Sequence, residues 1–174
     1  MSPEIFIIAT IEGGCLSVMP RPGVNQPLAD DIRAIADEGY DQVVSLLAQD
    51  EAQELGLAQE AALVQAAAME FTAFPIDDFT LPEPLQAFSE FTYCHYQNLM
   101  QGRKIVLHCR AGIGRSGMTA AAILIHSGQT ADAAFDQISR CRGVEVPDTA
   151  EQKDWIRSNQ VIIAEYGAIQ AALL

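Results

Sequence analysis

One short segment, residues 104–125, constrains the fold more than any other part of the sequence. Residues 104–107 (KIVL) form an apolar run typical of a buried strand, and residues 118–125 are typical of a helix. Between them lies a loop, residues 108–116 (HCRAGIGRS), that contains two glycines. The first backbone N–H groups of a helix have no intrahelical acceptor, and the helix dipole favours negative charge. The segment therefore predicts an anion site between a strand and a helix.

Helix and strand patterns alternate along the rest of the chain. Apolar runs predict strands over residues 5–10, 16–19, 42–47, 71–76 and 104–107, with a turn at Gly13-Gly14 between the first two. Helices are predicted over residues 28–36, 50–55, 58–69, 85–100, 116–127, 130–142 and from 148 onward. This alternation predicts one α/β domain over residues 1–174, with a central, mostly parallel twisted sheet flanked by helices.

Polar residues mark where several of these helices begin. Asp50 and Thr130 are predicted N-caps, and Asp148 with Glu151 fits a capping arrangement at the start of the last helix. The apolar stripe of that helix, residues 156–173, is predicted to cover the sheet rather than to bind a partner. A proline-rich loop, residues 77–84, follows the fourth strand, and no internal repeat or linker interrupts the pattern.

Composition narrows the class of protein. The chain has 174 residues, of which 49% are apolar, enough for one domain with a proper core. No apolar run approaches the roughly 20 residues that span a bilayer, and the first residues, MSPE, lack the basic stretch of a secretory signal. The four cysteines show no paired C-x-x-C spacing, so neither a zinc site nor a disulfide framework is indicated. We expect a cytoplasmic protein with reduced thiols, in which Cys15, Cys94 and Cys141 are small core residues, with a redox partner of Cys109 among them as the alternative.

Charge is distributed unevenly. Residues 1–100 hold 2 basic and 16 acidic side chains, whereas residues 101–174 hold 8 basic and 7 acidic ones. The segment 103–115 has four basic residues and no acidic one, within a chain of net charge −13. Binding to a phosphate backbone needs an extended basic surface rather than one pocket, so we expect neither nucleic acid nor an anionic membrane as a partner. The sequence leaves the oligomeric state open and is compatible with a monomer.

The chemistry of the loop is carried by a cysteine and an arginine six positions apart. Cys109 is the one covalent nucleophile of the loop, and a thiolate rather than a thiol attacks. Helix N–H groups and Arg115 favour the anion, and cysteines in such settings have pKa values of roughly 3.5 to 7.5. The planar fork of Arg115 matches two oxygens of a phosphoryl group, a geometry that lysine does not provide. A phosphoryl group is therefore the expected ligand.

The other residues of the loop are also consistent with a phosphoryl-binding site. Gly112 and Gly114 allow unusual backbone angles and close approach to a ligand. Ser116 is placed to donate a hydrogen bond to the Cys109 sulfur. The side chain of His108 is expected to point away from the mouth of the loop and to hydrogen-bond the loop from behind, because alternate strand residues face opposite ways.

These residues resemble a known family. Residues 108–116 are similar to the H-C-x5-R-[S/T] signature of cysteine-dependent protein phosphatases, and the chain looks most like the compact dual-specificity type of the protein tyrosine phosphatase superfamily. Residues 74–82 (FPIDDFTLP) are similar to the strand and acid loop of that family, in which an aspartate precedes the cysteine by about thirty residues. The resemblance covers residues 28–155 and is strongest in these two segments.

The resemblance implies roles for individual residues. It implies phosphate binding by residues 110–115 (Arg110, Ala111, Gly112, Ile113, Gly114 and Arg115), attack by Cys109 and a fold of the phosphotyrosine phosphatase type. It places the general acid on Asp78 rather than Asp77, because Pro82 matches the loop proline of the family. Gln152 matches a glutamine that positions the hydrolytic water, against the alternative of an ordinary exposed helix glutamine. Arg21 matches a region that borders the substrate pocket in relatives.

The implied activity is hydrolysis of a phosphorylated protein or a small phosphate ester, without a metal ion or another cofactor. The expected substrate is phosphotyrosine, with phosphoserine and phosphothreonine as further candidates. Only Arg110 is basic among residues 110–114, which disfavours polyphosphorylated lipids. A sulfurtransferase or arsenate reductase also uses a loop cysteine near an arginine, but neither needs Asp78. A non-catalytic module that binds phosphorylated partners would usually have lost Cys109, Arg115 or the acid, and all three are present.

Overall fold

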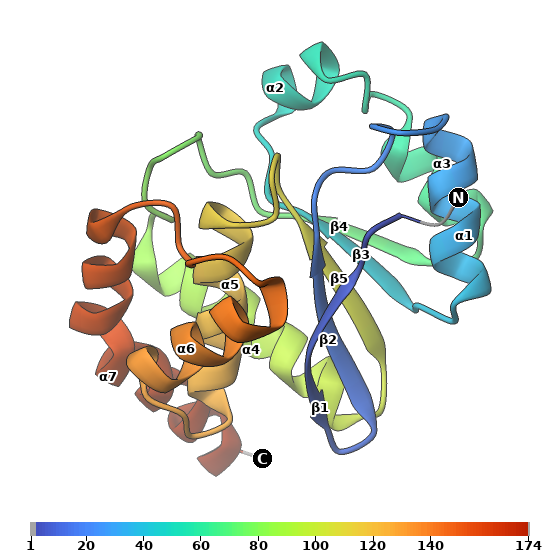
Figure 1. The fold of residues 1–174 in the computed structure, drawn as a ribbon. Helices are drawn as coiled ribbons and strands as arrows, with labels where there is room; N and C mark the ends of the chain where they lie inside the picture. Colours follow the sequence, from blue (N-terminus) through green and yellow to red (C-terminus); the bar gives the residue numbers. More distant parts are fainter. Residues whose placement is uncertain (1–2, 174) are drawn as a thin grey trace.

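The computed structural model describes residues 3–173, and within them five strands form one mixed sheet with helices on both faces (Figure 1). The strand order is β1-β2-β5-β3-β4; β1 pairs antiparallel with β2, and the other neighbours are parallel. The strands are β1 (Phe6–Ile11), β2 (Gly14–Met19), β3 (Gln42–Ser45), β4 (Glu70–Ala73) and β5 (Lys104–His108). The predicted α/β fold with a mostly parallel central sheet is confirmed. Of the domain predicted over 1–174, residues 1, 2 and 174 lie outside the described part.

The helices form two layers of unequal thickness. One face of the sheet carries α1 (Leu28–Asp37) and α3 (Glu60–Ala66), and the other carries α4 (Leu85–Met100), α5 (Gly114–His126), α6 (Ala131–Arg142) and α7 (Ala150–Ala172). The short helix α2 (Gln49–Glu54) follows β3 at the carboxyl end of the strand. Alternate residues of β5 point to opposite faces of the sheet. Ile105 and Leu107 pack in the larger core, and Val106 packs in the smaller one.

Helix α5 is the centre of the thicker layer. Every residue from Gly114 to Ile125 is buried, because the helix lies between the sheet and α4, α6 and α7. Helix α7 packs on α5 and α4, with Ile156 and Ile163 fully buried. The stripe therefore contributes to the core, as predicted, but it packs on α5 and α4 rather than on the sheet, because α5 already occupies that face. A helix buried on all sides holds its N-terminus, where Arg115 lies, in a fixed place.

The start of α7 differs by one residue from the prediction. The N-cap is Thr149, whose side chain accepts from the Gln152 N–H at 3.1 Å, while Gln152 Oε1 accepts from the Thr149 N–H at 3.3 Å. This capping box replaces the predicted pair of Asp148 and Glu151. The carboxylate of Asp148 therefore does not cap the helix.

Two smaller predictions also need correction. Ala48 rather than Asp50 is the N-cap residue of α2, and Asp50 lies in the first turn. The first hairpin turns at Glu12 and Gly13, which both have positive φ, so that Gly14 already belongs to β2. The predicted N-cap Thr130 is confirmed, since its side chain accepts from the Ala133 N–H at 3.2 Å.

Candidate active site

The predicted loop lies where the central strand ends. Cys109 directly follows β5, which is flanked by parallel strands on both sides, and its side chain is 2% exposed. The carboxyl ends of neighbouring parallel strands meet at this edge of the sheet, where ligands of open α/β folds bind. The loop runs from there into α5, which begins at Gly114 rather than at the predicted Ser116.

Backbone carbonyls of the loop are turned outward. The N–H of Arg21 donates to the carbonyl of Arg110 at 3.1 Å, and the guanidinium of Arg142 donates to the carbonyls of Ala111 and Gly112 at 3.1 and 2.9 Å. In a trans peptide the C=O and the next N–H point in opposite directions. The amide N–H groups of residues 111–113 therefore face the inside of the loop, as binding of an anion requires.

Gly112 and Arg142 make this loop shape possible. Gly112 has φ +70°, and a Cβ there would collide with the backbone carbonyl of Met19. The guanidinium of Arg142 lies 3.9 Å from the centre of the Phe6 ring, and burial lowers its pKa from the ordinary value. Arg142 was not found by sequence reasoning, because a basic residue in the last turn of a helix is common for reasons of the helix dipole.

Arg115 is held by several acceptors at once. Its side chain is 1% exposed, and its Nη1 and Nη2 atoms lie 2.6 and 3.0 Å from the two carboxylate oxygens of Glu51 on α2. Nη1 also donates to the carbonyl of Ile76 at 3.0 Å. Burial opposes the charge of Arg115, but the Glu51 hydrogen bonds and the charges of Cys109, Glu51 and Asp78 outweigh it and raise its pKa. Sequence reasoning missed Glu51, because nothing in the sequence distinguishes it from other acidic residues of α2.

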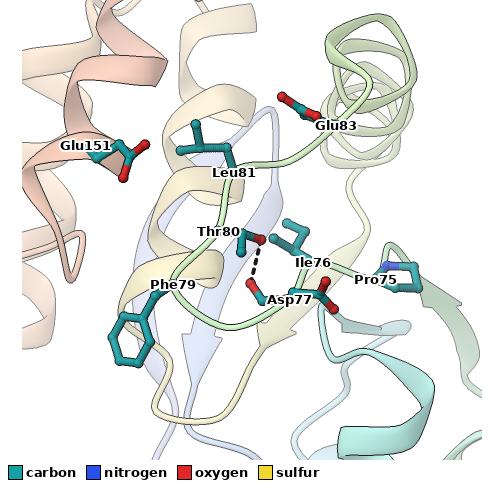
Figure 2. Close-up of a pocket in the computed structure, with 8 residues that line it drawn as sticks. All are labelled: Pro75, Ile76, Asp77, Phe79, Thr80, Leu81, Glu83 and Glu151. Carbon is teal, nitrogen blue, oxygen red and sulfur yellow. Dashed lines mark hydrogen bonds between the residues drawn. The ribbon is translucent and has the colours of Figure 1, made fainter.

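The two adjacent aspartates of the acid loop have different surroundings. Asp78 Oδ1 lies 3.1 Å from Nη2 of Arg115 and accepts from the N–H of Phe79 at 3.2 Å. Asp77 instead lines a groove of about 540 Å³ between the acid loop and Glu151 of α7, and its carbonyl accepts from the Thr80 hydroxyl at 2.8 Å (Figure 2). The structure thus brings Asp78, and not Asp77, into contact with Arg115.

Asp148 and Gln152 meet the loop at Gly114. A Cβ at Gly114 would collide with the Asp148 carboxylate, and it would lie 3.1 Å from Gln152 Oε1. Burial and the charge of Asp78 raise the pKa of Asp148, although the Gly114 N–H and Arg115 act in the opposite direction. Gln152 is buried, which contradicts an ordinary exposed helix glutamine, and within residues 3–173 its Nε2 has no hydrogen-bond partner. Sequence reasoning assigned Asp148 only to the helix cap.

The predicted supporting residues divide into two cases. His108 is fully buried, its Nδ1 is 3.2 Å from the Cys109 carbonyl, and its Nε2 is 2.7 Å from Oε1 of buried Glu60. It therefore contacts the loop from behind, as expected. Ser116 is also buried, but its hydroxyl makes no hydrogen bond with any described residue. The predicted bond from Ser116 to the Cys109 sulfur is not formed.

The other cysteines lie apart from this chemistry. Cys15 is buried, but Cys94 and Cys141 are exposed, so the prediction that all three are core residues was wrong for two of them. Both positions lie on helices whose outer faces the sequence pattern did not distinguish. Across residues 3–173, no three His, Cys, Asp or Glu side chains come together as metal ligands, and no helix is long and apolar enough to cross a membrane.

Solved structures share this fold. Kinase associated phosphatase, with its catalytic cysteine replaced by serine, superposes with a TM-score of 0.84 at 19% identity, covering 94% of this chain and 97% of that one. PTPMT1 gives a TM-score of 0.76 at 18% identity, with 95% and 99% covered. Human DUSP28 gives 0.64 at 20% identity, with 98% and 99% covered. At these identities the likeness shows the fold alone.

A family model extends the comparison to sequence. The model described as Tc-R-P, polymorphic toxin system, DSP-PTPase phosphatase, matches residues 17–129, which include Asp78 and the whole loop from Cys109 to Arg115. No curated protein sequence gives a significant match. The matched segment covers well over half of the chain and ends before Asp148 and Gln152. The chain therefore belongs to this family of DSP-PTPase phosphatases and is a cysteine-dependent phosphatase of the dual-specificity and protein tyrosine type.

Proposed function

We propose that the protein hydrolyses phosphate monoesters through a phosphocysteine intermediate on Cys109, with phosphotyrosine in proteins as the main substrate. Phosphoserine and phosphothreonine are the further substrates of this proposal. The observation that carries it is the loop itself, in which inward N–H groups surround a cysteine next to a fixed arginine. The contact between Arg115 and Asp78 supplies an acid beside the same position.

In the first step the Cys109 thiolate attacks phosphorus. A new S–P bond forms, the P–O bond of the ester breaks, and Asp78 gives its proton to the departing oxygen. The guanidinium of Arg115 and the N–H groups of the loop hold the phosphoryl oxygens, where charge is largest in the transition state. These donors are fixed beforehand by Glu51 and Arg142, so little reorganisation accompanies the reaction.

In the second step a water molecule attacks the phosphocysteine. A P–O bond forms, the S–P bond breaks, and the electron pair returns to the Cys109 sulfur as a thiolate. Asp78, now a carboxylate, is available to take the proton of that water. Gln152, buried beside the loop, is the proposed residue that positions the water. The enzyme returns to its starting state, with inorganic phosphate as the product.

The loop favours a protein substrate over a polyphosphorylated lipid. Arg110 is the one basic side chain between Cys109 and Arg115, and it is exposed. PTPMT1, a protein of similar fold, has been solved in complex with PI(5)P. A monophosphorylated lipid is therefore a necessary comparison in any substrate panel.

The proposal is tested by turnover of p-nitrophenyl phosphate, of phosphotyrosine, phosphoserine and phosphothreonine peptides, and of PI(5)P. We expect the phosphotyrosine peptide to be hydrolysed fastest among the natural esters. Cys109→Ser should abolish turnover and still bind vanadate or phosphate. Asp78→Asn should slow esters with poor leaving groups far more than p-nitrophenyl phosphate, by about 10²- to 10⁴-fold, whereas the matched variant Asp77→Asn should not. Activity retained by Cys109→Ser, or a leaving-group effect confined to Asp77→Asn, contradicts these assignments.

A further inference from the structure

A second carboxylate, that of Asp148, faces the loop at Gly114, the first residue of α5. We propose that Asp148, with Gln152 beside it, takes the proton of the hydrolytic water when the phosphocysteine is hydrolysed. The inference rests on the proposed function and refines its second step. It adds a catalytic residue that lies outside the matched family segment, residues 17–129.

The position of Asp148 is fixed by its contact with the loop. Its carboxylate faces the N–H of Gly114, the first residue of α5, so closely that any side chain at Gly114 would collide with it. The charges of two groups of the site, Asp78 and Arg115, also act on the carboxyl group of Asp148, Asp78 raising its pKa and Arg115 lowering it. Because Thr149 and Gln152 cap α7, the Asp148 side chain is not used as the N-cap of this helix. The side chain remains open to solvent, which a base acting on a water molecule requires.

Gln152 supplies the second, independent observation. Its side chain is 1% exposed, and its Oε1 is used by the Thr149 N–H. The Nε2 group is buried and has no acceptor among residues 3–173. A buried N–H donor without an acceptor costs about 1 to 3 kcal/mol, so such a group in a native protein calls for a missing partner. A water molecule held between Nε2 and the neighbouring Asp148 would satisfy the donor.

The two carboxylates of the site differ in how strongly they are engaged. Asp78 Oδ1 is in contact with the Arg115 guanidinium and with the N–H of Phe79. Asp148 forms no ion pair within the described chain, and burial together with the charge of Asp78 raises its pKa. A carboxylate with a raised pKa is a stronger base than an ordinary one. Because Asp148 has no arginine partner, we assign it the proton of water, whereas Asp78, in contact with Arg115, is assigned to the departing ester oxygen.

The proton balance of the cycle follows from this division. Water attacks phosphorus, the S–P bond breaks to release the Cys109 thiolate, and the proton of water passes to Asp148. Asp148 then gives the proton to Asp78, directly or through solvent, and this restores the acid for the next substrate. No oxidant, reductant or metal ion enters either step.

The experiment follows the two steps separately by rapid quench with p-nitrophenyl phosphate. Formation of p-nitrophenol reports the first step, and the mass of the quenched protein reports the phosphocysteine. We expect Asp148→Asn to form the intermediate at the wild-type rate and to hydrolyse it at least about tenfold more slowly, so that phosphocysteine accumulates. Glu145→Gln is the matched control, because Glu145 is an exposed carboxylate three residues earlier in the same loop. Its hydrolysis rate should equal that of the wild type.

The pH dependence of the second step gives an independent readout. A base must be deprotonated, so the wild-type rate should fall as the pH drops through the raised pKa of Asp148, and this limb should be absent in Asp148→Asn. Burial lowers the pKa of His126 to about 4, so the fold also loses stability as the pH falls from 6.5 toward 4. Rates are therefore compared between variants at each pH, with the folded fraction measured by circular dichroism.

The possible failures are distinct. If the wild type forms no phosphocysteine at all, the proposed function is wrong. If the wild type forms it and Asp148→Asn hydrolyses it at the wild-type rate, Asp148 is not the base. If Asp148→Asn slows formation of p-nitrophenol as much as hydrolysis, Asp148 supports the shape of the loop and is not the base of the second step. If hydrolysis of the phosphocysteine is slowed only in Asp78→Asn, the base is Asp78.

Discussion

Two carboxylates contact the catalytic segment from different sides, and they differ in their partner and in their exposure to solvent. Glu51 binds the Arg115 side chain through both oxygens, at 2.6 and 3.0 Å, and is 16% exposed. Glu60 contacts the His108 ring at 2.7 Å, and both side chains are buried. The two glutamates come from neighbouring short helices, α2 and α3, yet one faces the site and the other faces the interior.

We infer that the Glu51–Arg115 contact prepares the site for a ligand, whereas the Glu60–His108 contact supports the fold. Arg115 already contacts Asp78 as well as Glu51, and its planar fork is the group that a phosphoryl group must engage. His108 meets the loop from behind, at the carbonyl of Cys109. We therefore expect changes at the Arg115 contact to affect activity and changes at the His108 contact to affect stability.

The largest expected effect is the loss of the arginine fork. Arg115→Lys keeps the positive charge but cannot offer two parallel N–H groups to Glu51 or to a phosphoryl group. We expect kcat/KM for p-nitrophenyl phosphate to fall by about 10²- to 10³-fold, the cost of losing a donor to transition-state charge. Arg110→Lys, at an exposed arginine of the same loop, is the control and should change kcat/KM by less than about tenfold. If Arg115→Lys loses no more activity than Arg110→Lys, the charge of Arg115 is sufficient and its fork is not needed.

The next effect concerns stability rather than catalysis. Glu60→Ala removes the carboxylate that lies 2.7 Å from the buried His108 Nε2, and we expect a cost of the size found for an unsatisfied buried polar group, about 1 to 3 kcal/mol. Urea denaturation should show this loss, with kcat/KM of the folded protein within a few-fold of wild type. Glu54→Ala, at an exposed position of α2, should change stability by at most about 0.5 kcal/mol. A stable but inactive Glu60→Ala would overturn the distinction between the two pairs.

The sequence alone predicts the parts of this arrangement that are local. The strand, loop and helix around Cys109 follow from apolar periodicity and glycine positions, and the acid loop follows from a short family motif. Glu51, Glu60 and Arg142 could not be predicted in the same way. Each acts on residues 30 or more positions away, and on its own helix each has the pattern of an ordinary solvated charge.

Small errors of register account for other failures. Moving the cap of α7 from Asp148 to Thr149 changes Asp148 from a helix residue into a side chain that faces the loop. The amphipathic pattern of α7 was detected, but periodicity does not say which surface a helix covers, and α5 had already covered the sheet. The buried, unpartnered hydroxyl of Ser116 likewise depends on a rotamer that the sequence does not specify.

The smallest expected effect tests whether Glu51 orients Arg115 or only neutralises it. Glu51→Gln keeps the shape and one acceptor oxygen but loses the second hydrogen bond to the guanidinium. Since Asp78 still contacts Arg115, the charge does not become unpaired, and we expect kcat/KM to fall about tenfold, equivalent to about 1.4 kcal/mol. Asp50→Asn, on the adjacent exposed residue of α2, should leave kcat/KM unchanged. If Glu51→Gln instead lowers the free energy of unfolding and spares kcat/KM, Glu51 supports the fold as Glu60 does, and the preparation of Arg115 for its ligand must come from Asp78 and the Ile76 carbonyl.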